Sequence, residues 1–407
     1  MRTPAIAWLS DVEGQWDKLQ SFCAQNPLVS LDGDRLEVAP GAVFVFGGDA
    51  VDRGPAGRRI LRALVAVLRR QPGQVVLLAG NRDLNKLRLA RELRGFPPGR
   101  TPEELRRGPR GPLLRWIFQN TMGAAQAFAH RAAELGEPGD EAVVESYLED
   151  LAPGGAMRDY LAAAQLAFRA GATLCLHGGV TGQNFGVAPG APRVRDADAW
   201  VENLNRFYAA QLAAFLADDL RDPARAPPWE PLVAYQAPLR GSRANQESVV
   251  YARPTDPDGN PLLPPAEVSA LLGAAGISRV VVGHTPSGDC PAVLRGDGLE
   301  LVLADNSYGR VERGSQLAIT PEGDLRVSSA CVLDDGTPAE VRFALARGDA
   351  ASPLGRLAGA TGELVKSRLE GGAYLLFKSL PGYTTAQRAL APEGLATLEL
   401  GNPRRQG

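Results

Sequence analysis

Short apolar runs alternate with amphipathic runs over the first part of the chain. Residues 5–9, 42–46 and 74–78 are apolar, β-branched or aromatic runs of strand length, and Gly or Asp soon follows each of them. Residues 58–70, between the second and third runs, carry Ile60, Leu61, Leu64 and Leu68 at helical spacing. This alternation of strands and helices predicts a layered α/β core.

The pattern changes twice further along. Residues 84–170 carry helical runs (122–135 and 155–170) around a Pro/Gly/Arg-rich stretch, which predicts an inserted helical cap. Strand-like runs then return at residues 172–176, 279–282 and 299–303. A second insert covers about 185–275 and carries a helical run at 200–220. Further short β-like runs follow at residues 316–320, 325–332, 339–346 and 373–377. We therefore expect one domain over residues 1–330 with two inserts, and a β-rich extension over residues 331–407.

Composition narrows the class of protein. The 407 residues are 44% hydrophobic and 22% charged, which is typical of a globular chain with a substantial core. The net charge of −2 provides no overall basic field for nucleic acid. The four cysteines form no C-x-x-C pair, so neither a disulfide framework nor a thiolate zinc site is indicated. Because the chain also lacks a signal-like or membrane-spanning apolar run, we expect a cytoplasmic protein that does not enter the membrane.

Polar residues gather just after the carboxyl ends of the expected strands, where α/β sheets bind ligands. In chain order they are Asp11 and Glu13; Asp49, Asp52 and Arg53; Asn81, Arg82 and Asp83; His177; His284; and Asp305 and Asn306. Carboxylates, a carboxamide and neutral imidazoles together bind divalent metals, and one carboxylate can bridge two ions. Two such ions clamp the attacking and leaving oxygens of a phosphoryl displacement. The pattern predicts metal-assisted phosphate hydrolysis.

Five ordered blocks carry a family resemblance. They are S-D-V-E-G at 10–14, G-D-A-V-D-R-G at 48–54, G-N-R-D at 80–83, H-G-G at 177–179 and G-H-T-P at 283–286. They resemble the motifs of the calcineurin-like metallophosphoesterases, nearest the branch of Ser/Thr phosphoprotein phosphatases and diadenosine tetraphosphatases. The resemblance spans about residues 4–310. It implies an α/β fold with a four-layer β-sandwich flanked by helices, to which the helical cap and the C-terminal β-rich extension are added.

The resemblance also implies roles for the matching residues. Asp49 would bridge two divalent ions, for which Mn²⁺ or Mg²⁺ is preferred and Fe, Zn or Ni are alternatives. The other ligands would be Asn81, His177 and His284 for one ion, and Asp11 and Glu13 for the other. Individually these residues also suit ordinary roles, since Asp11 and Asp49 fit helix N-caps and the histidines fit a polar core. The five blocks in sequence favour metal ligation.

Other matching positions would contact substrate. Arg53 would bind the phosphoryl group bidentately, with Arg82 and Asp52 beside it in the catalytic site. Tyr308 resembles the tyrosine that closes the pocket in the phosphatase branch. One of Arg240, Arg243 and Arg253, in the second insert, would supply a further phosphate-binding group, with Arg243 and Arg253 preferred.

Two positions depart from the family pattern. Glu13 stands where the family usually has histidine, which gives a harder, all-carboxylate ligand set or leaves a site with only one tight metal. Arg82 stands where the family has the histidine thought to protonate the leaving oxygen, and arginine cannot donate a proton near neutral pH. Arg82 is expected either to neutralise charge on the substrate or to pair with Asp52 or Asp83. We infer a slow hydrolase, one whose leaving group needs no proton, or one whose acid comes from the helical cap.

The sequence therefore favours a metal-dependent phosphoesterase. Its expected substrate is a phosphate ester or phosphoanhydride of a small metabolite or nucleotide, attacked by a metal-bridging hydroxide. The alternatives are a protein phosphatase, a metal- or phosphate-binding pseudoenzyme, and an RNA phosphodiesterase that uses the arginine-rich stretch between Arg82 and Arg115. Nucleic acid is the less favoured partner, because the same stretch fits a solvated cap in an arginine-rich chain.

Overall fold

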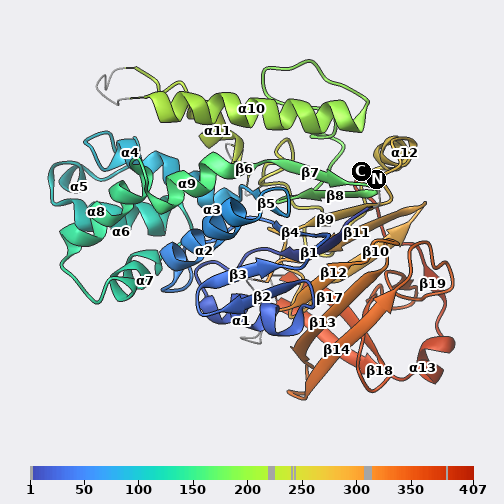
Figure 1. Ribbon diagram of the computed structural model, residues 1–407. Helices are drawn as coiled ribbons and strands as arrows, with labels where there is room; N and C mark the ends of the chain where they lie inside the picture. The colour runs from blue at the N-terminus through green and yellow to red at the C-terminus, as the bar shows by residue number, and fades with distance from the viewer. Residues whose placement is uncertain (1–2, 219–224, 240–241, 243, 307–313, 382–383) are drawn as a thin grey trace.

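The computed structural model describes residues 3–218, 225–239, 242, 244–306, 314–381 and 384–407. Two β-sheets face each other at the centre of the molecule, and helices cover their outer faces (Figure 1). The four-layer α/β architecture expected from the sequence is confirmed.

The first sheet has seven strands in the order β14-β13-β12-β1-β4-β5-β6. Their bounds are β1 (Ala5–Leu9), β4 (Ala42–Phe46), β5 (Val75–Leu78), β6 (Ala164–Gln165), β12 (Gln316–Ile319), β13 (Leu325–Val332) and β14 (Pro338–Leu345). Along β1, Ile6 and Trp8 pack between the two sheets, whereas Ala7 and Leu9 pack toward the helices. Because both faces are buried, the strand appears in the sequence as an unbroken apolar run.

The second sheet has five strands in the order β10-β11-β9-β8-β7. Their bounds are β7 (Ala167–Ala170), β8 (Thr173–Leu176), β9 (Arg279–Val282), β10 (Ala292–Gly296) and β11 (Leu299–Leu303). Helix α10 (Ala197–Ala217) runs along its outer side in Figure 1 and buries Leu204 and Tyr208 in the same core as Leu174 of β8. Helix α12 (Ala266–Ala274) adds Leu272 to this core.

The prediction of a helix over residues 155–170 is wrong for the second half of this segment. Helix α9 (Ala156–Ala163) ends before strands β6 and β7, which continue to Ala170. The Asn205 side chain of α10 accepts hydrogen bonds from the backbone of Leu166 and Ala167, and β7 then pairs with β8 through a turn at Gly171. These tertiary hydrogen bonds determine the conformation of an alanine-rich segment whose own pattern does not separate strand from helix.

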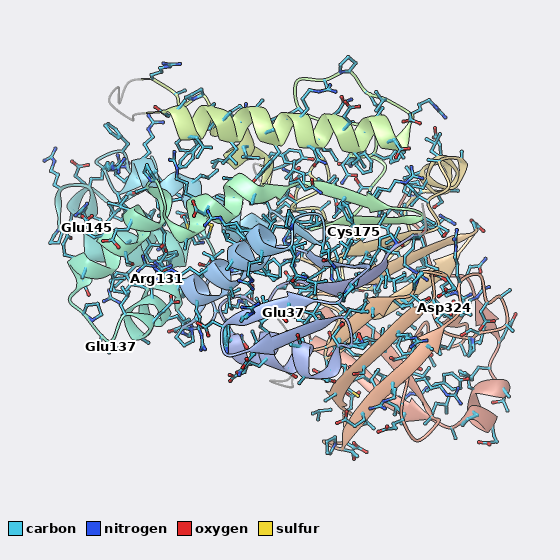
Figure 2. The ribbon with its side chains drawn as sticks, in the orientation of Figure 1. Glu37, Arg131, Glu137, Glu145, Cys175 and Asp324 are labelled. Carbon is cyan, nitrogen blue, oxygen red and sulfur yellow. The ribbon has the colours of Figure 1, made fainter. Side chains whose placement is uncertain are left out.

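The helical insert lies against helix α2 (Gly57–Arg70) of the core. Its helices are α3 (Asn81–Asn85), η1 (Lys86–Arg88), α4 (Leu89–Glu92), α5 (Glu103–Arg107), α6 (Arg110–Thr121), α7 (Ala127–Glu134), α8 (Asp140–Leu151) and α9. Arg131, labelled in Figure 2, is buried and donates from Nη1 to Asp150 Oδ2 at 2.7 Å. Arg58 of α2 donates from Nε to the other oxygen of Asp150 at 2.8 Å. One buried carboxylate thus ties the insert to the core.

The end of the chain forms a sheet with the order β18-β17-β16-β15-β19. Its elements are β15 (Leu357–Ala358), β16 (Leu364–Arg368), β17 (Tyr374–Leu380), β18 (Thr384–Leu390), α13 (Pro392–Ala396) and β19 (Leu400–Gly401). Val365, Leu375 and Leu376 join the core between the two main sheets. The first sheet itself continues past residue 330, because β13 and β14 belong to it. A division at about residue 330 stays a prediction.

Smaller elements complete the description. Helix α1 (Trp16–Gln25), the hairpin of β2 (Val29–Asp32) and β3 (Arg35–Val38), and helix α11 (Glu230–Tyr235) flank the main layers. The four cysteines are buried and form no disulfide with one another; Cys175 is labelled in Figure 2. Among the residues that the structure describes, no helix is both long and apolar enough to cross a membrane.

Candidate metal centre

Six strand ends converge on one site, as the sequence predicts. Strands β1, β4 and β5 are parallel neighbours in one sheet, and β8, β9 and β11 are parallel neighbours in the other. The loops after them carry Asp11, Glu13, Asp49, Asp52, Asn81, Arg82, His177, His284 and Asp305. Five of these residues adopt left-handed backbone angles, with φ of 55° at Asp11, 48° at Glu13, 57° at Asp49, 105° at Asp52 and 57° at His284. Such conformations cost free energy and cluster at functional sites.

The loops approach one another so closely that glycine is required between them. A Cβ atom on Gly80 would lie 2.2 Å from Asp49 Oδ1, well inside contact distance. Gly48, at φ +95°, would place a Cβ atom 2.9 Å from His177 Nδ1. Asp83 fastens the same loops, since its carboxylate accepts hydrogen bonds from the backbone N–H groups of Asp49 and Gly80 at 2.9 Å each.

Asp49, His177 and His284 form a buried cluster that could hold a metal ion. One potential ligand atom from each residue lies within 4.8 Å of the others. His177 Nδ1 lies 2.7 Å from the Gly47 carbonyl oxygen, which can only accept, so Nδ1 carries a proton. The other ring nitrogen, Nε2, faces Asn81 Oδ1 at 3.2 Å and Asp49 Oδ1 at 3.4 Å, and it can ligate a metal ion when it carries no proton. Three converging potential ligand atoms fit a cation.

The state of His284 also suits ligation. Burial lowers the pKa of His284 well below its ordinary value, and Arg253 and His177 add to the effect. The imidazole is therefore neutral near pH 7, as metal binding requires. Arg253 Nε donates to His284 Nε2 at 3.4 Å, and the Tyr251 ring packs 5.0 Å from the imidazole. Of the residues expected in the second insert and at the pocket entrance, Arg253 is thus placed at the cluster, whereas Arg240, Arg243 and Tyr308 lie outside the described residues.

Glu13 has a different environment from the imidazole cluster. Its Oε1 is paired with Arg82 Nε, and its Oε2 lies 3.2 Å from Arg53 Nε. Arg82 Nε also lies 3.5 Å from Asp49 Oδ2. Burial raises the pKa of the Glu13 carboxyl to about 8, against the attraction of the two guanidinium groups. The two residues that depart from the family pattern therefore pair with each other.

Asp11 lies beside this pair and next to His284. Both of its carboxylate oxygens lie 3.2 Å from the backbone nitrogen of His284, which donates to them. Burial raises the pKa of Asp11 well above its ordinary value, and the neighbouring carboxylates of Asp305 and Asp49 raise it further.

Two buried lysines at this site do not appear among the predicted residues. Lys18 of α1 donates to the Asn306 carbonyl oxygen, and Lys86 donates to Asp52 Oδ2 at 2.8 Å. Burial lowers the pKa of each lysine, and nearby carboxylates oppose the change. The chain has only four lysines, and this rarity is the one feature of the sequence that could have drawn attention to Lys18 and Lys86.

The arginine-rich stretch is largely neutralised by acids of the insert. Arg110 pairs with Glu141 and Glu145, Arg115 with Asp140, Arg107 with Glu103, and Arg88 with Glu92. This pairing favours the solvated-cap interpretation over a phosphate-binding surface.

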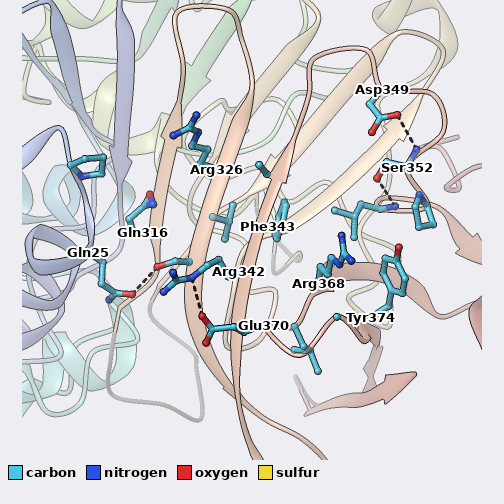
Figure 3. A pocket seen from close by; sticks show the side chains of 18 of the residues that line it. Gln25, Gln316, Arg326, Arg342, Phe343, Asp349, Ser352, Arg368, Glu370 and Tyr374 are labelled. Carbon is cyan, nitrogen blue, oxygen red and sulfur yellow. Dashed lines mark hydrogen bonds and ion pairs between the residues drawn. The ribbon is translucent and has the colours of Figure 1, made fainter. Parts of the chain in front are cut away.

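A hollow in the described part of the chain lies away from the metal cluster. Its volume is about 1120 Å³, and its lining comes from β13, β14 and the C-terminal sheet together with Gln25 (Figure 3). Arg342 and Glu370, both on its lining, pair with each other at 3.5 Å (Figure 3). Of the sequence-predicted site residues that the structure describes, none lines it.

Comparisons with known proteins agree with the fold and the motifs. The calcineurin-like phosphoesterase family model matches residues 4–288. A symmetrical bis(5'-nucleosyl)-tetraphosphatase of Burkholderia pseudomallei is 35% identical over 85 residues, which is 21% of this chain and 29% of that protein. The chain thus matches less than a third of that relative's length.

Two solved phosphatase structures match the chain at low similarity. The cold-active protein-tyrosine phosphatase of a psychrophilic Shewanella species is 16% identical, with a TM-score of 0.46 over 83% of this chain and 80% of that one. A protein serine/threonine phosphatase from Saccharomyces cerevisiae is 14% identical, with a TM-score of 0.36 over 85% of this chain and 81% of that one. The family match over most of its length identifies this chain as a member of the calcineurin-like phosphoesterase family.

Proposed function

We propose that the protein hydrolyses a phosphate ester or phosphoanhydride of a small metabolite or nucleotide at the strand-end site. The observation that carries this proposal is the convergence of His177 Nε2, Asn81 Oδ1 and Asp49 Oδ1 beside His284. These four residues would hold a divalent ion. Such an ion, when bound, polarises a phosphoryl oxygen and lowers the pKa of water.

The arginines beside the cluster would bind the phosphoryl group. Arg53 keeps 28% of its side chain exposed, so a ligand can reach it. Arg82 Nη1 is buried and makes no hydrogen bond within the described part of the chain. A phosphoryl oxygen would satisfy this donor. Asp52 would act as a positioning residue, because its Oδ2 binds Lys86 and lies 3.7 Å from Arg82 Nη1.

Arg82 would keep its proton throughout the reaction. Burial lowers the pKa of its guanidinium, but the carboxylates of Glu13, Asp49 and Asp52 outweigh burial and bring the pKa above its ordinary value. Arg82 would therefore stabilise negative charge rather than protonate the leaving oxygen. Substrates whose leaving group departs as a stable anion suit such a site, and phosphoanhydrides are the biological example.

Similarity to a symmetrical bis(5'-nucleosyl)-tetraphosphatase supports dinucleoside polyphosphates as the first substrates to test. The ion-paired arginines of the insert argue against the RNA alternative. Mn²⁺ is the first metal to supply, because it accepts both imidazole and oxygen ligands.

The test is hydrolysis by purified protein of an aryl phosphomonoester, an aryl phosphodiester and diadenosine tetraphosphate, with Mn²⁺, Mg²⁺, Zn²⁺ or Ni²⁺ in turn. We expect metal-dependent turnover that Asp49→Asn abolishes. The matched control is Asp34→Asn, which makes the same change at a side chain that is 62% exposed. Equal loss in both variants, or no turnover of any substrate with any of these metals, would overturn the proposal.

A further inference from the structure

The sequence pattern predicts two metal ions, but the side chains at the second position are already paired with the guanidinium group of Arg82. The predicted ligands there are Asp11, Glu13 and Asp49. Glu13 is paired through Oε1 with Arg82 and through Oε2 with Arg53. Asp49 Oδ2, the oxygen that would reach the second ion, faces Arg82 Nε at 3.5 Å. Arg82 thus contacts two of the three predicted ligands.

The two carboxylate oxygens of Asp49 face different kinds of group. Oδ1 faces His177 Nε2, a potential metal ligand, at 3.4 Å and accepts a hydrogen bond from the Arg82 backbone at 2.8 Å. Oδ2 faces the guanidinium of the same arginine. A divalent cation fits the Oδ1 side, where potential ligand atoms converge, whereas the Arg82 guanidinium already lies on the Oδ2 side. Asp49 therefore bridges an ion site and a fixed guanidinium.

The guanidinium is held in place on several sides. The Arg82 side chain is only 11% exposed, and Glu13 is 2% exposed. Arg82 Nη1 lies 3.7 Å from Asp52 Oδ2, and the same oxygen pairs with Lys86 Nζ. A divalent ion bound to Glu13 would have to displace a buried guanidinium or lie in contact with it, and like charges in a buried site repel strongly.

We propose that this phosphoesterase binds one divalent ion per chain, at Asp49, Asn81, His177 and His284, and that the Arg82 guanidinium takes the place of a second ion. The proposal rests on the proposed function for its metal site. It also changes the expected metal, because two imidazoles, a carboxylate and a carboxamide favour a first-row transition ion over Mg²⁺.

The test counts Mn²⁺ per chain and needs no substrate. Metal-free protein is loaded with Mn²⁺, desalted, and measured by elemental analysis, by native mass spectrometry and by electron paramagnetic resonance. We expect one ion per chain and the spectrum of an isolated ion in the wild type. His177→Ala should lower occupancy to well under one. Two ions per chain with a spin-coupled spectrum would overturn the proposal, and so would none.

A double variant tests whether Arg82 is the cause. Glu13→His with Arg82→His removes the ion pair and supplies an imidazole ligand, and we expect its occupancy to rise to two. Occupancy of one in this folded variant would overturn the assignment to Arg82. The same samples separate this inference from the proposed function. One ion without hydrolysis would refute only the function, and two ions with hydrolysis would refute only the inference.

Discussion

Replacing Arg82 by methionine tests the buried ion pair at the site by its effect on stability. Methionine keeps an unbranched side chain but removes the charge that pairs with Glu13. The two side chains are 11% and 2% exposed, so Glu13 would lose its closest partner inside the protein. Removing one member of a buried ion pair costs about 3–5 kcal/mol. The exposed pair of Arg35 and Glu37, at 63% and 52% exposure, provides the control, for which about 1 kcal/mol or less is expected.

The assay is urea denaturation of metal-free protein at pH 8.5, above the pKa of about 8 of Glu13, so that its carboxylate is ionised. Arg82→Met should lower the free energy of unfolding by about 3–5 kcal/mol. At pH 6 the loss should be smaller, because Glu13 is then protonated. Glu13→Gln combined with Arg82→Met should recover part of the loss, since neither charge remains unpaired. A loss at pH 8.5 no larger than that of Arg35→Met would refute the reasoning.

Three further predictions concern the same site. Gly80→Ala should weaken Mn²⁺ binding about 10–100-fold in a titration, because the new Cβ atom would lie 2.2 Å from Asp49 Oδ1, whereas the control Gly139→Ala, which meets no atom within 4 Å, should bind normally. Burial raises the pKa of Glu13 from 4.5 to about 8, so its contribution to stability is complete below pH 4.5 and is lost as the pH rises through 8. Thermal unfolding of metal-free protein should thus show lower stability at pH 8.5 than at pH 5, and an equal fall in Glu13→Gln would exclude Glu13 as a cause. Among aryl phosphates, kcat should fall as the pKa of the leaving phenol rises, because Arg82 donates no proton; a flat profile would indicate a side-chain acid.

The placement of the site was predictable because strand ends can be found in the sequence. The runs at 5–9, 42–46, 279–282 and 299–303 coincide with β1, β4, β9 and β11. Both faces of these strands are buried, so their apolar character is continuous and their ends are sharp. The ligand-type residues that follow therefore fall at one edge of each sheet.

The partner of Glu13 could not be predicted in the same way. Glu13 and Arg82 lie 69 positions apart, and the sequence presents them as two unrelated departures from the family pattern. Only the order β1-β4-β5 in the first sheet brings their loops together. The opposite charges of the two residues could have indicated their pairing, because an acidic and a basic replacement at one site can neutralise each other's charge.

The buried lysines illustrate a second limit of prediction from the sequence. Lys18 lies four positions before Phe22 on the buried side of α1, so helical spacing indicates its burial but not its partner. Lys366 is fully buried in β16 and donates to the Ser287 carbonyl oxygen in the loop after His284. That contact joins segments 79 positions apart, which no local pattern encodes.

The most direct test of the account is a titration of metal-free protein with Mn²⁺ during hydrolysis of an aryl phosphomonoester. The account predicts no turnover without metal, a rise in proportion to bound Mn²⁺, and a plateau at one ion per chain. A plateau that is reached only at two ions would contradict the role given to Arg82. Turnover that is independent of bound metal would contradict the site itself.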